Sequence, residues 1–144
     1  MDLNYETAKA IVEAAHAAWN AGSVEGMLEK YVDDMVYATN TGPDGSLLMI
    51  RGKEDFRARF EPVMAIIDSR TSMQSFRFDG DAARVRFKTF VRHRQTGQEM
   101  TGSFRQLVQF RGFKICRLED FHDAAKMAAF WRLVNMQTAD NKRV

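Results

Sequence analysis

Residues 71–123, TSMQSFRFDGDAARVRFKTFVRHRQTGQEMTGSFRQLVQFRGFKICRLEDFHD, alternate apolar and polar side chains over long stretches. This alternation with period two is typical of β-strands that bury one face. The connections at 79–81, 95–97 and 112 are short and contain glycine, which favours antiparallel neighbours. The stretch therefore predicts four long strands of one antiparallel sheet, which must twist and curve because of their length. The predicted strands cover 71–79, 82–94, 99–111 and 114–123.

Helical patterns flank these strands. Residues 4–21 are rich in alanine and repeat apolar side chains at helical spacing, and Ser23 is suited to cap a second, short helix. Residues 53–68 repeat phenylalanine and other apolar residues every three or four positions, and Pro62 predicts a kink or a broken turn there. Two short strands are expected before this segment. A closing helix over 124 to about 137 is expected to precede a frayed polar tail, 138–144.

Helices followed by long strands predict an α+β fold in one domain over residues 1–144. The N-terminal helices are expected on the concave face of the curved sheet. A curved sheet closed on one side by helices forms a cone, and a cone has a mouth that can admit a ligand. The sequence thus predicts one mostly apolar pocket.

Composition excludes several classes of function. Hydrophobic residues make up 45% and charged residues 28% of the 144 residues, which is ordinary for a globular domain. The net charge of +2 is too small to suggest a nucleic-acid partner. Cys116 is the only cysteine, so no intramolecular disulfide or cysteine-based zinc site is possible, and its apolar surroundings favour a buried thiol. No apolar run is long enough for a membrane span and no leader pattern is present, so a cytoplasmic location and no membrane partner are expected.

No cofactor or metal is expected either. Nucleotide-binding and serine-hydrolase motifs are absent, and no third ligand accompanies His122 and Asp120 at a metal-binding spacing. His93 lies near a hairpin turn between two arginines and is expected to be exposed at the edge of the sheet. In the basic strand ARVRFKTFVRHR the arginines alternate with apolar residues, which indicates a solvated outer face; the alternative is an anion-binding strip.

Three further segments, taken in order, resemble the nuclear-transport-factor-2-like superfamily, which includes ketosteroid isomerases and SnoaL-like polyketide cyclases. AAWNAGSVEGMLEKYVDDMVY is similar to the helix–helix–strand opening of that family, IRGKEDFRARF to the start of its third helix, and GFKICRLEDFHDAA to its last strand. The resemblance covers about Thr7 to Ala125. It implies a cone-shaped, cystatin-like α+β barrel that binds a small apolar molecule and forms a homodimer. Leu107, with Arg105 and Gln109 beside it, would lie on the outer sheet face that pairs.

The resemblance does not extend to the mechanism of the steroid isomerases. Their catalytic tyrosine falls on Ala15 here, their general-base aspartate on Thr39, and their second, protonated aspartate near Gln106. All three positions differ. Steroid isomerisation by that mechanism is therefore excluded, and only the fold analogy remains.

Asp120 and His122 are the best candidates for chemistry. Alternation in 115–122 puts Cys116 and Leu118 on the same face as these two, and the resemblance, not the pattern, indicates that this face is inward. SnoaL-like cyclases use an aspartate on the last strand as a general base, which implies that role for Asp120. His122 would orient it or act as general acid, and His16 on the first helix would join them. Residues expected to contact substrate are Trp19, Tyr37, Thr39, Phe56, Phe60, Gln106, Val108, Phe110 and Leu118.

These residues support two readings of function. The first is a cofactor-independent isomerase, cyclase or dehydratase that acts on a small apolar carbonyl compound. The alternative is a non-catalytic ligand-binding or dimerisation domain, in which Asp120 and His122 only satisfy each other or a backbone group. The sequence alone does not choose between them.

Overall fold

The computed structural model describes residues 2–142, and its helices and strands follow the predicted order closely. Three helices precede the long strands, and one helix follows them. In chain order the elements are α1 (Tyr5–Asn20), α2 (Val24–Leu28), β1 (Tyr31–Thr39), the 3-10 turn η1 (Pro43–Gly45), β2 (Leu48–Arg51), α3 (Lys53–Met64), β3 (Ile67–Asp79), β4 (Ala82–His93), β5 (Glu99–Arg111), β6 (Lys114–Phe121) and α4 (Ala124–Lys142).

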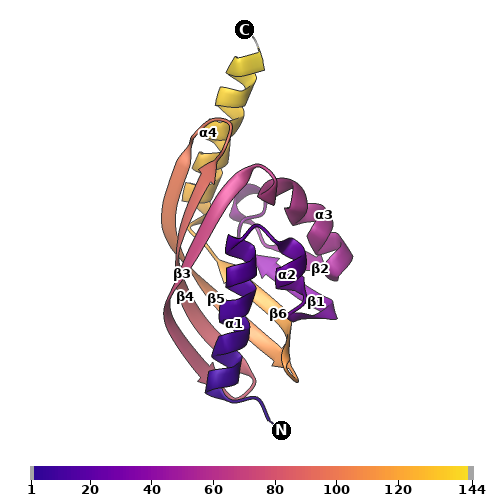
Figure 1. Cartoon of the computed structure of the whole chain (residues 1–144). Coiled ribbons are helices and arrows are strands. Elements are labelled where there is room, and N and C mark those ends of the chain that lie inside the picture. The colour runs from indigo at the N-terminus through magenta and orange to yellow at the C-terminus, as the bar shows by residue number, and fades with distance from the viewer. Residues whose placement is uncertain (1, 143–144) are drawn as a thin grey trace.

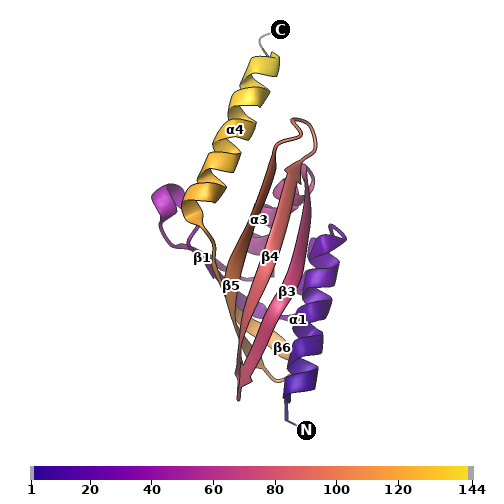
Figure 2. The ribbon, with the colours of Figure 1, turned by 90° about the vertical axis from the view of Figure 1, so that its left-hand side faces the viewer.

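One curved sheet contains all six of these strands in the order β2-β1-β6-β5-β4-β3. The pairs from β3 to β6 are antiparallel, as their short connections predicted. β1 joins β6 in parallel and carries β2 on its other side, so the sheet remains unclosed. Figures 1 and 2 show the long strands bending past α1, with α2 and α3 on the same side. The predicted α+β cone is confirmed, with an open sheet rather than a closed barrel.

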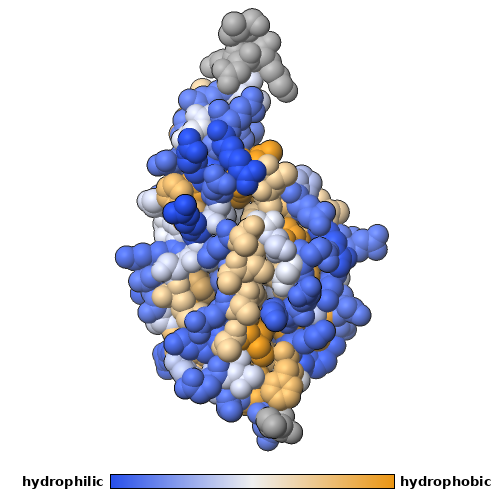
Figure 3. Space-filling model, in the orientation of Figure 1, coloured by the Kyte–Doolittle hydropathy of each residue, from blue (hydrophilic) through white to orange (hydrophobic). Residues whose placement is uncertain are grey.

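Helix α1 covers part of the concave face of the sheet. It packs closely there because the side chains that it buries are small and apolar. The side chain of Asn4 caps its N-terminus by accepting a hydrogen bond from the backbone N–H of Thr7, at 2.9 Å. Its buried residues are Ala8, Val12 and Ala15. The opposite side is exposed to solvent, and Figure 3 shows a narrow pale apolar stripe over α1 between hydrophilic side chains. None of the helices in the described part of the chain is long and apolar enough to cross a membrane.

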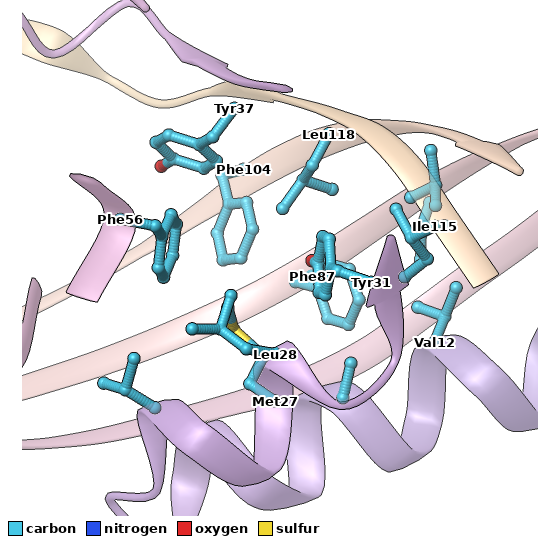
Figure 4. Packing of buried hydrophobic residues seen from close by; sticks show 14 of the residues in the cluster. Val12, Met27, Leu28, Tyr31, Tyr37, Phe56, Phe87, Phe104, Ile115 and Leu118 are labelled. Carbon is cyan, nitrogen blue, oxygen red and sulfur yellow. The ribbon is translucent and has the colours of Figure 1, made fainter. Parts of the chain in front are cut away.

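The core joins this sheet to the first three helices. Val12 from α1, Leu28 from α2 and Phe56 from α3 point toward Phe87 and Ile115 of the sheet, as Figure 4 shows. All five side chains are buried to 98% or more. Full burial of such a side chain stabilises a fold by roughly 1.5–3 kcal/mol, so this cluster holds the helices rigidly over the inner face.

The third helix ends earlier than predicted. α3 stops at Met64, two residues after Pro62, whereas the pattern suggested helix as far as residue 68. β3 begins at Ile67, because Ile67 pairs with His93 of β4 and enters the sheet. Hydrogen bonding between β3 and β4 thus outweighs the helical spacing of the apolar residues at the end of α3.

The C-terminal helix is longer than predicted. The proposed frayed tail is wrong for residues 138–142, which continue α4 as far as Lys142, and residues 143–144 lie outside the described range. Phe130 and Val134, four residues apart, are buried and anchor the helix. The hydroxyl of Thr138 donates to the carbonyl of Val134 at 2.8 Å, inside a helix that Figure 2 shows extending beyond the sheet.

Two predictions about single residues are wrong. Cys116 is partly exposed, and Ile115 takes its buried place, because an irregular register between Gln109 and Phe110 shifts the alternation in β6. His93 is only 4% exposed. Its Nδ1 accepts a hydrogen bond from the backbone N–H of Thr96 at 3.2 Å, and the indole of Trp131 from α4 lies edge-on to its ring.

The predicted outer face of the basic strand is confirmed. Arg84, Arg86 and Lys88 are exposed, while Val85 and Phe87 are buried on the inner face. This alternation gives the sheet a polar outer side and an apolar concave side. The concave side is where the candidate site lies.

Candidate functional site

A cavity of about 490 Å³ opens between the concave sheet and helices α1, α3 and α4. Its volume is within the usual range for small-molecule sites. Much of the wall is aromatic or aliphatic, and a few polar groups converge at its inner end. The apolar part of the wall includes Trp19, Met27, Leu48, Phe56, Phe60, Val63, Ile67, Phe104, Leu118, Met127 and Trp131.

Asp120 is the central polar group of this cavity. It lies on β6 between Thr39 of β1 and Gln106 of β5, and only 7% of its surface is exposed. Its Oδ2 accepts a hydrogen bond from the hydroxyl of Tyr37 at 3.0 Å. Its Oδ1 is buried and has no hydrogen-bond partner among the described residues. An unpaired buried acceptor of this kind costs about 1–3 kcal/mol and is rare in native proteins, so it marks Asp120 as a candidate functional group.

Tyr37 fixes the orientation of the Asp120 carboxylate. Its ring packs edge-on against Phe56 and Phe60, with both centroid distances 5.4 Å. Burial, and then the neighbouring Asp120 carboxylate, raise the pKa of Tyr37 well above its ordinary value. The phenol therefore stays protonated at neutral pH and donates to Asp120. Burial raises the pKa of the nearby Tyr31 as well.

His16 brings α1 into the same polar network. Its Nε2 lies 3.0 Å from Oε1 of Gln106, and its Nδ1 lies 2.7 Å from the hydroxyl of Thr71. Its ring stacks on Phe87 at a centroid distance of 3.8 Å. Burial lowers the pKa of His16 below its ordinary value, although the hydrogen bond to Gln106 and the charge of Asp120 oppose this. The neutral ring donates from Nε2 to Oε1 of Gln106, and its Nδ1 lies beside the Thr71 hydroxyl, which has one proton for either this nitrogen or Oδ1 of Asn20.

His122 lies next to Asp120 without a direct hydrogen bond. Its Nε2 is 3.7 Å from Oδ2 of Asp120, which is too long for one. Its ring stacks on Phe104, with centroids 4.5 Å apart. The side-chain amide of Asn40 holds the backbone of His122, donating to its carbonyl at 2.8 Å and accepting from its N–H at 2.9 Å. The sequence suggested that the two side chains meet directly or through one bridging atom. The distance between Nε2 of His122 and Oδ2 of Asp120 excludes the direct hydrogen bond in this structure and is compatible with a bridging atom.

The structure brings most of the predicted site residues together. Nine line the cavity and come from α1, β1, α3, β5, β6 and the residue that follows β6, namely His16, Trp19, Tyr37, Phe56, Phe60, Gln106, Leu118, Asp120 and His122. The cavity lining does not include Thr39, Val108 or Phe110, contrary to the prediction that they contact the substrate. Val108 is fully buried in the core, Phe110 packs on Phe78, and the hydroxyl of Thr39 bonds that of Thr41.

Several cavity residues were missed by the sequence reasoning. Ser69 and Thr71 belong to the inner face of β3, which the alternation could have shown if the strand had been started at Ile67. The indole N–H of Trp19 donates to the hydroxyl of Ser69 at 3.2 Å. α4 contributes Met127, Trp131 and Asn135, whose spacing of four residues is a signal for one helical face.

A larger hollow, of about 910 Å³, lies on the outer side of the sheet. Its lining includes Arg77, Arg84, Arg86 and Arg105. Arg77 stands directly opposite Arg84, and Arg86 opposite Arg105, on neighbouring strands. These exposed side chains are not oriented by buried partners, so we place the candidate site in the inner cavity. Within the described residues, no group of three or more His, Cys, Asp or Glu side chains is arranged to hold a metal ion.

Burial of His16 predicts a dependence of stability on pH. The unfolded chain takes up a proton on this imidazole near its ordinary pKa of about 6.5, whereas the folded chain does so only at lower pH. The free energy of unfolding should therefore fall as the pH drops below about 6.5, by at most about 1.4 kcal/mol per pH unit for one proton.

Urea unfolding of the wild type and of His16→Asn at pH 5, 6 and 7 measures this dependence. The variant should lose less stability between pH 7 and pH 5 than the wild type does. Equal losses in the two proteins contradict a neutral, buried His16.

The family profile of the SnoaL-like domain matches residues 12–118, which run from within α1 into β6 and include most of the cavity wall. No protein of curated function matches the sequence.

Solved structures share the fold at low sequence identity. A protein of unknown function from Burkholderia pseudomallei, described as NTF2-like, superposes with a TM-score of 0.76 and 20% identity, over 86% of this chain and 96% of that one. A putative polyketide cyclase from Xanthomonas campestris gives 0.73 and 16%, over 88% and 98%. An epoxide hydrolase from Mycobacterium tuberculosis gives 0.71 and 17%, over 93% and 97%. At these identities the likeness concerns the fold alone, because one fold hosts many reactions.

Proposed function

Because the chain belongs to the SnoaL-like domain family, we propose that it binds a small, largely apolar carbonyl compound and that Asp120 acts on it as a general base. The reaction class is cofactor-independent isomerisation, cyclisation or dehydration. Each of these begins with removal of a proton from the carbon beside a carbonyl group. The neighbouring folds described as cyclase and hydrolase are compatible with small-molecule chemistry in this cavity.

The unpaired Oδ1 of Asp120 is the observation that carries this proposal. A buried carboxylate oxygen without a donor is unusual in native proteins, and here it belongs to a residue that lines the cavity. Tyr37 occupies the other oxygen and holds the carboxylate in place. Oδ1 is therefore the atom that takes the proton from a bound substrate.

The same cavity offers partners for the carbonyl oxygen. As the proton moves to Asp120, negative charge develops on that oxygen, and preorganised donors stabilise it. The amide nitrogen of Gln106 makes no hydrogen bond within the described residues and lies in the cavity wall. His122, on the other side of Asp120, supplies the second donor or returns the proton to the product.

An exchange experiment tests this proposal without knowledge of the natural substrate. 2-Tetralone is an apolar aromatic ketone with acidic protons beside its carbonyl group. In D₂O, the protein should accelerate deuterium incorporation at those positions above the buffer background, as measured by proton NMR. Tight binding of the ketone with no acceleration would instead support the alternative, a non-catalytic ligand-binding domain.

We also propose that the protein is a homodimer that pairs through the outer sheet face, and that it is cytoplasmic. Leu107 and the 51%-exposed Phe121 supply apolar area on that face. The arginines beside them repel a second copy, and salt screens such repulsion. In sedimentation experiments the dimer should therefore strengthen between about 20 mM and 500 mM NaCl. Leu107→Arg should weaken it, because it removes apolar area and adds to the repulsion, and a monomeric mass at both salt concentrations contradicts pairing.

A further inference from the structure

Exposure divides the cavity into a floor and a rim. Its most buried polar residues are Tyr31, Tyr37, Gln106 and Asp120, which form the floor. Its exposed residues include Arg59 on α3 and Asn135 on α4, which mark the opening. The wall between them is mainly aromatic and aliphatic, so a ligand that fills the cavity contacts polar groups at both of its ends.

The floor and the rim carry opposite charges. Asp120 and Arg59 are the only aspartate, glutamate, lysine or arginine residues in the described lining of the cavity. An anionic group on a ligand is repelled from the carboxylate at the floor and attracted to the guanidinium at the rim. The field inside the cavity therefore orients a ligand that carries one negative charge.

Arg59 is also free to meet such a group. Within the described residues, no carboxylate oxygen lies within 4.0 Å of its guanidinium nitrogens. The neighbouring Arg57, by contrast, forms an ion pair with Glu25. The acids nearest to Arg59 along α3, Asp55 and Glu61, are exposed and do not line the cavity.

We propose that the ligand is an amphiphile with an anionic end, a carboxylate or similar oxyanion, held at the rim by Arg59 and the amide of Asn135. Its apolar body fills the aromatic wall, and its carbonyl or hydroxyl group reaches Asp120. This assignment rests on the function proposed above and adds the class of substrate. Guanidinium groups suit oxyanions because they donate two parallel hydrogen bonds.

Two dyes of the same skeleton test the proposal. 8-Anilinonaphthalene-1-sulfonate carries a sulfonate, N-phenyl-1-naphthylamine lacks it, and both fluoresce when they leave water. Arg59→Gln should weaken binding of the sulfonate dye by about three- to tenfold and leave the neutral dye unchanged, because the pair at the rim is partly solvated. Arg132→Gln removes the same charge from an exposed position of α4 outside the cavity lining and should change neither affinity.

Val63→Trp separates failure of this proposal from failure of the proposed function. Val63 lines the cavity on α3, so a tryptophan there should reduce the affinity for both dyes. Binding of the neutral dye that Val63→Trp blocks would show that the cavity is a ligand site. If Arg59→Gln then affects both dyes equally, or neither of them, the proposal of an anionic ligand is wrong, whereas the cavity remains a ligand site. If the neutral dye does not bind, or Val63→Trp has no effect, the cavity itself is not a ligand site and both proposals fail.

Discussion

Asp120→Asn is expected to slow deuterium exchange into 2-tetralone by about 10²- to 10⁴-fold relative to the wild type, which is the usual contribution of a positioned general base. The amide has nearly the same shape as the carboxylate but does not take up a proton. Tyr37 can still donate to the remaining carbonyl oxygen, so the residue stays in place. The measurement is the initial exchange rate by proton NMR, at equal protein concentrations.

The free energy of unfolding distinguishes loss of the base from loss of the fold. Asp120→Asn should leave it unchanged or raise it, because a neutral amide is less costly to bury than a carboxylate that has an unpaired oxygen. Asp79→Asn changes an exposed aspartate at the end of β3 and serves as the matched control, with an unaltered exchange rate. An Asp120→Asn protein that is folded and exchanges as fast as the wild type excludes Asp120 as the base.

Phe87→Ala is expected to destabilise the fold by about 3–5 kcal/mol, the usual cost of removing a large aromatic side chain from a packed core. Phe87 is 1% exposed and lies between the rings of His16, at 3.8 Å, and Phe104, at 5.2 Å. The substitution leaves a hole beneath His16, so it should also loosen the hydrogen bonds of that residue to Gln106 and Thr71.

Urea unfolding measures the first effect, with Phe113→Ala as the control. Phe113 is 47% exposed in the turn between β5 and β6, and its replacement should change stability by less than about 0.5 kcal/mol. Equal, small effects of the two substitutions contradict the packing described around Phe87.

Local periodicity was sufficient to predict most of the architecture. In β4 the alternation of Arg84, Val85, Arg86 and Phe87 gave both the strand and its buried face, because one side packs on the helices and the other meets water. Capping by Ser23 was also predictable, since its hydroxyl accepts the N–H of Gly26 within the same short helix. Such features depend on residues that are close in sequence.

Features that depend on distant partners were not predictable in this way. The irregular register beside Phe110 exchanges the burial of Ile115 and Cys116, and only the pairing of two strands determines it. The burial of His93 depends on Trp131, which lies 38 residues further on in α4, a helix that the sequence predicted too short. The start of β3 at Ile67 is set by β4 in the same manner.

The candidate site has features of both kinds, some predictable from the sequence and some not. The inward face of Asp120 and His122 followed from alternation combined with the family resemblance, whereas their separation of 3.7 Å did not. Nothing in the sequence indicated that Tyr37 would occupy Oδ2 and leave Oδ1 unpaired, because that choice depends on the packing of Tyr37 between Phe56 and Phe60. The rim formed by α3 and α4 likewise required the three-dimensional arrangement.

A high-resolution crystal structure of the protein soaked with 2-tetralone would show whether Asp120 is placed to act as the base, since it locates the atoms around Oδ1 of Asp120. We expect the ketone inside the cavity, with the carbon that loses its proton facing Oδ1 and the carbonyl oxygen near Gln106 or His122. An Asp120 side chain turned away to bond His122, beside a cavity filled by protein side chains, would contradict it.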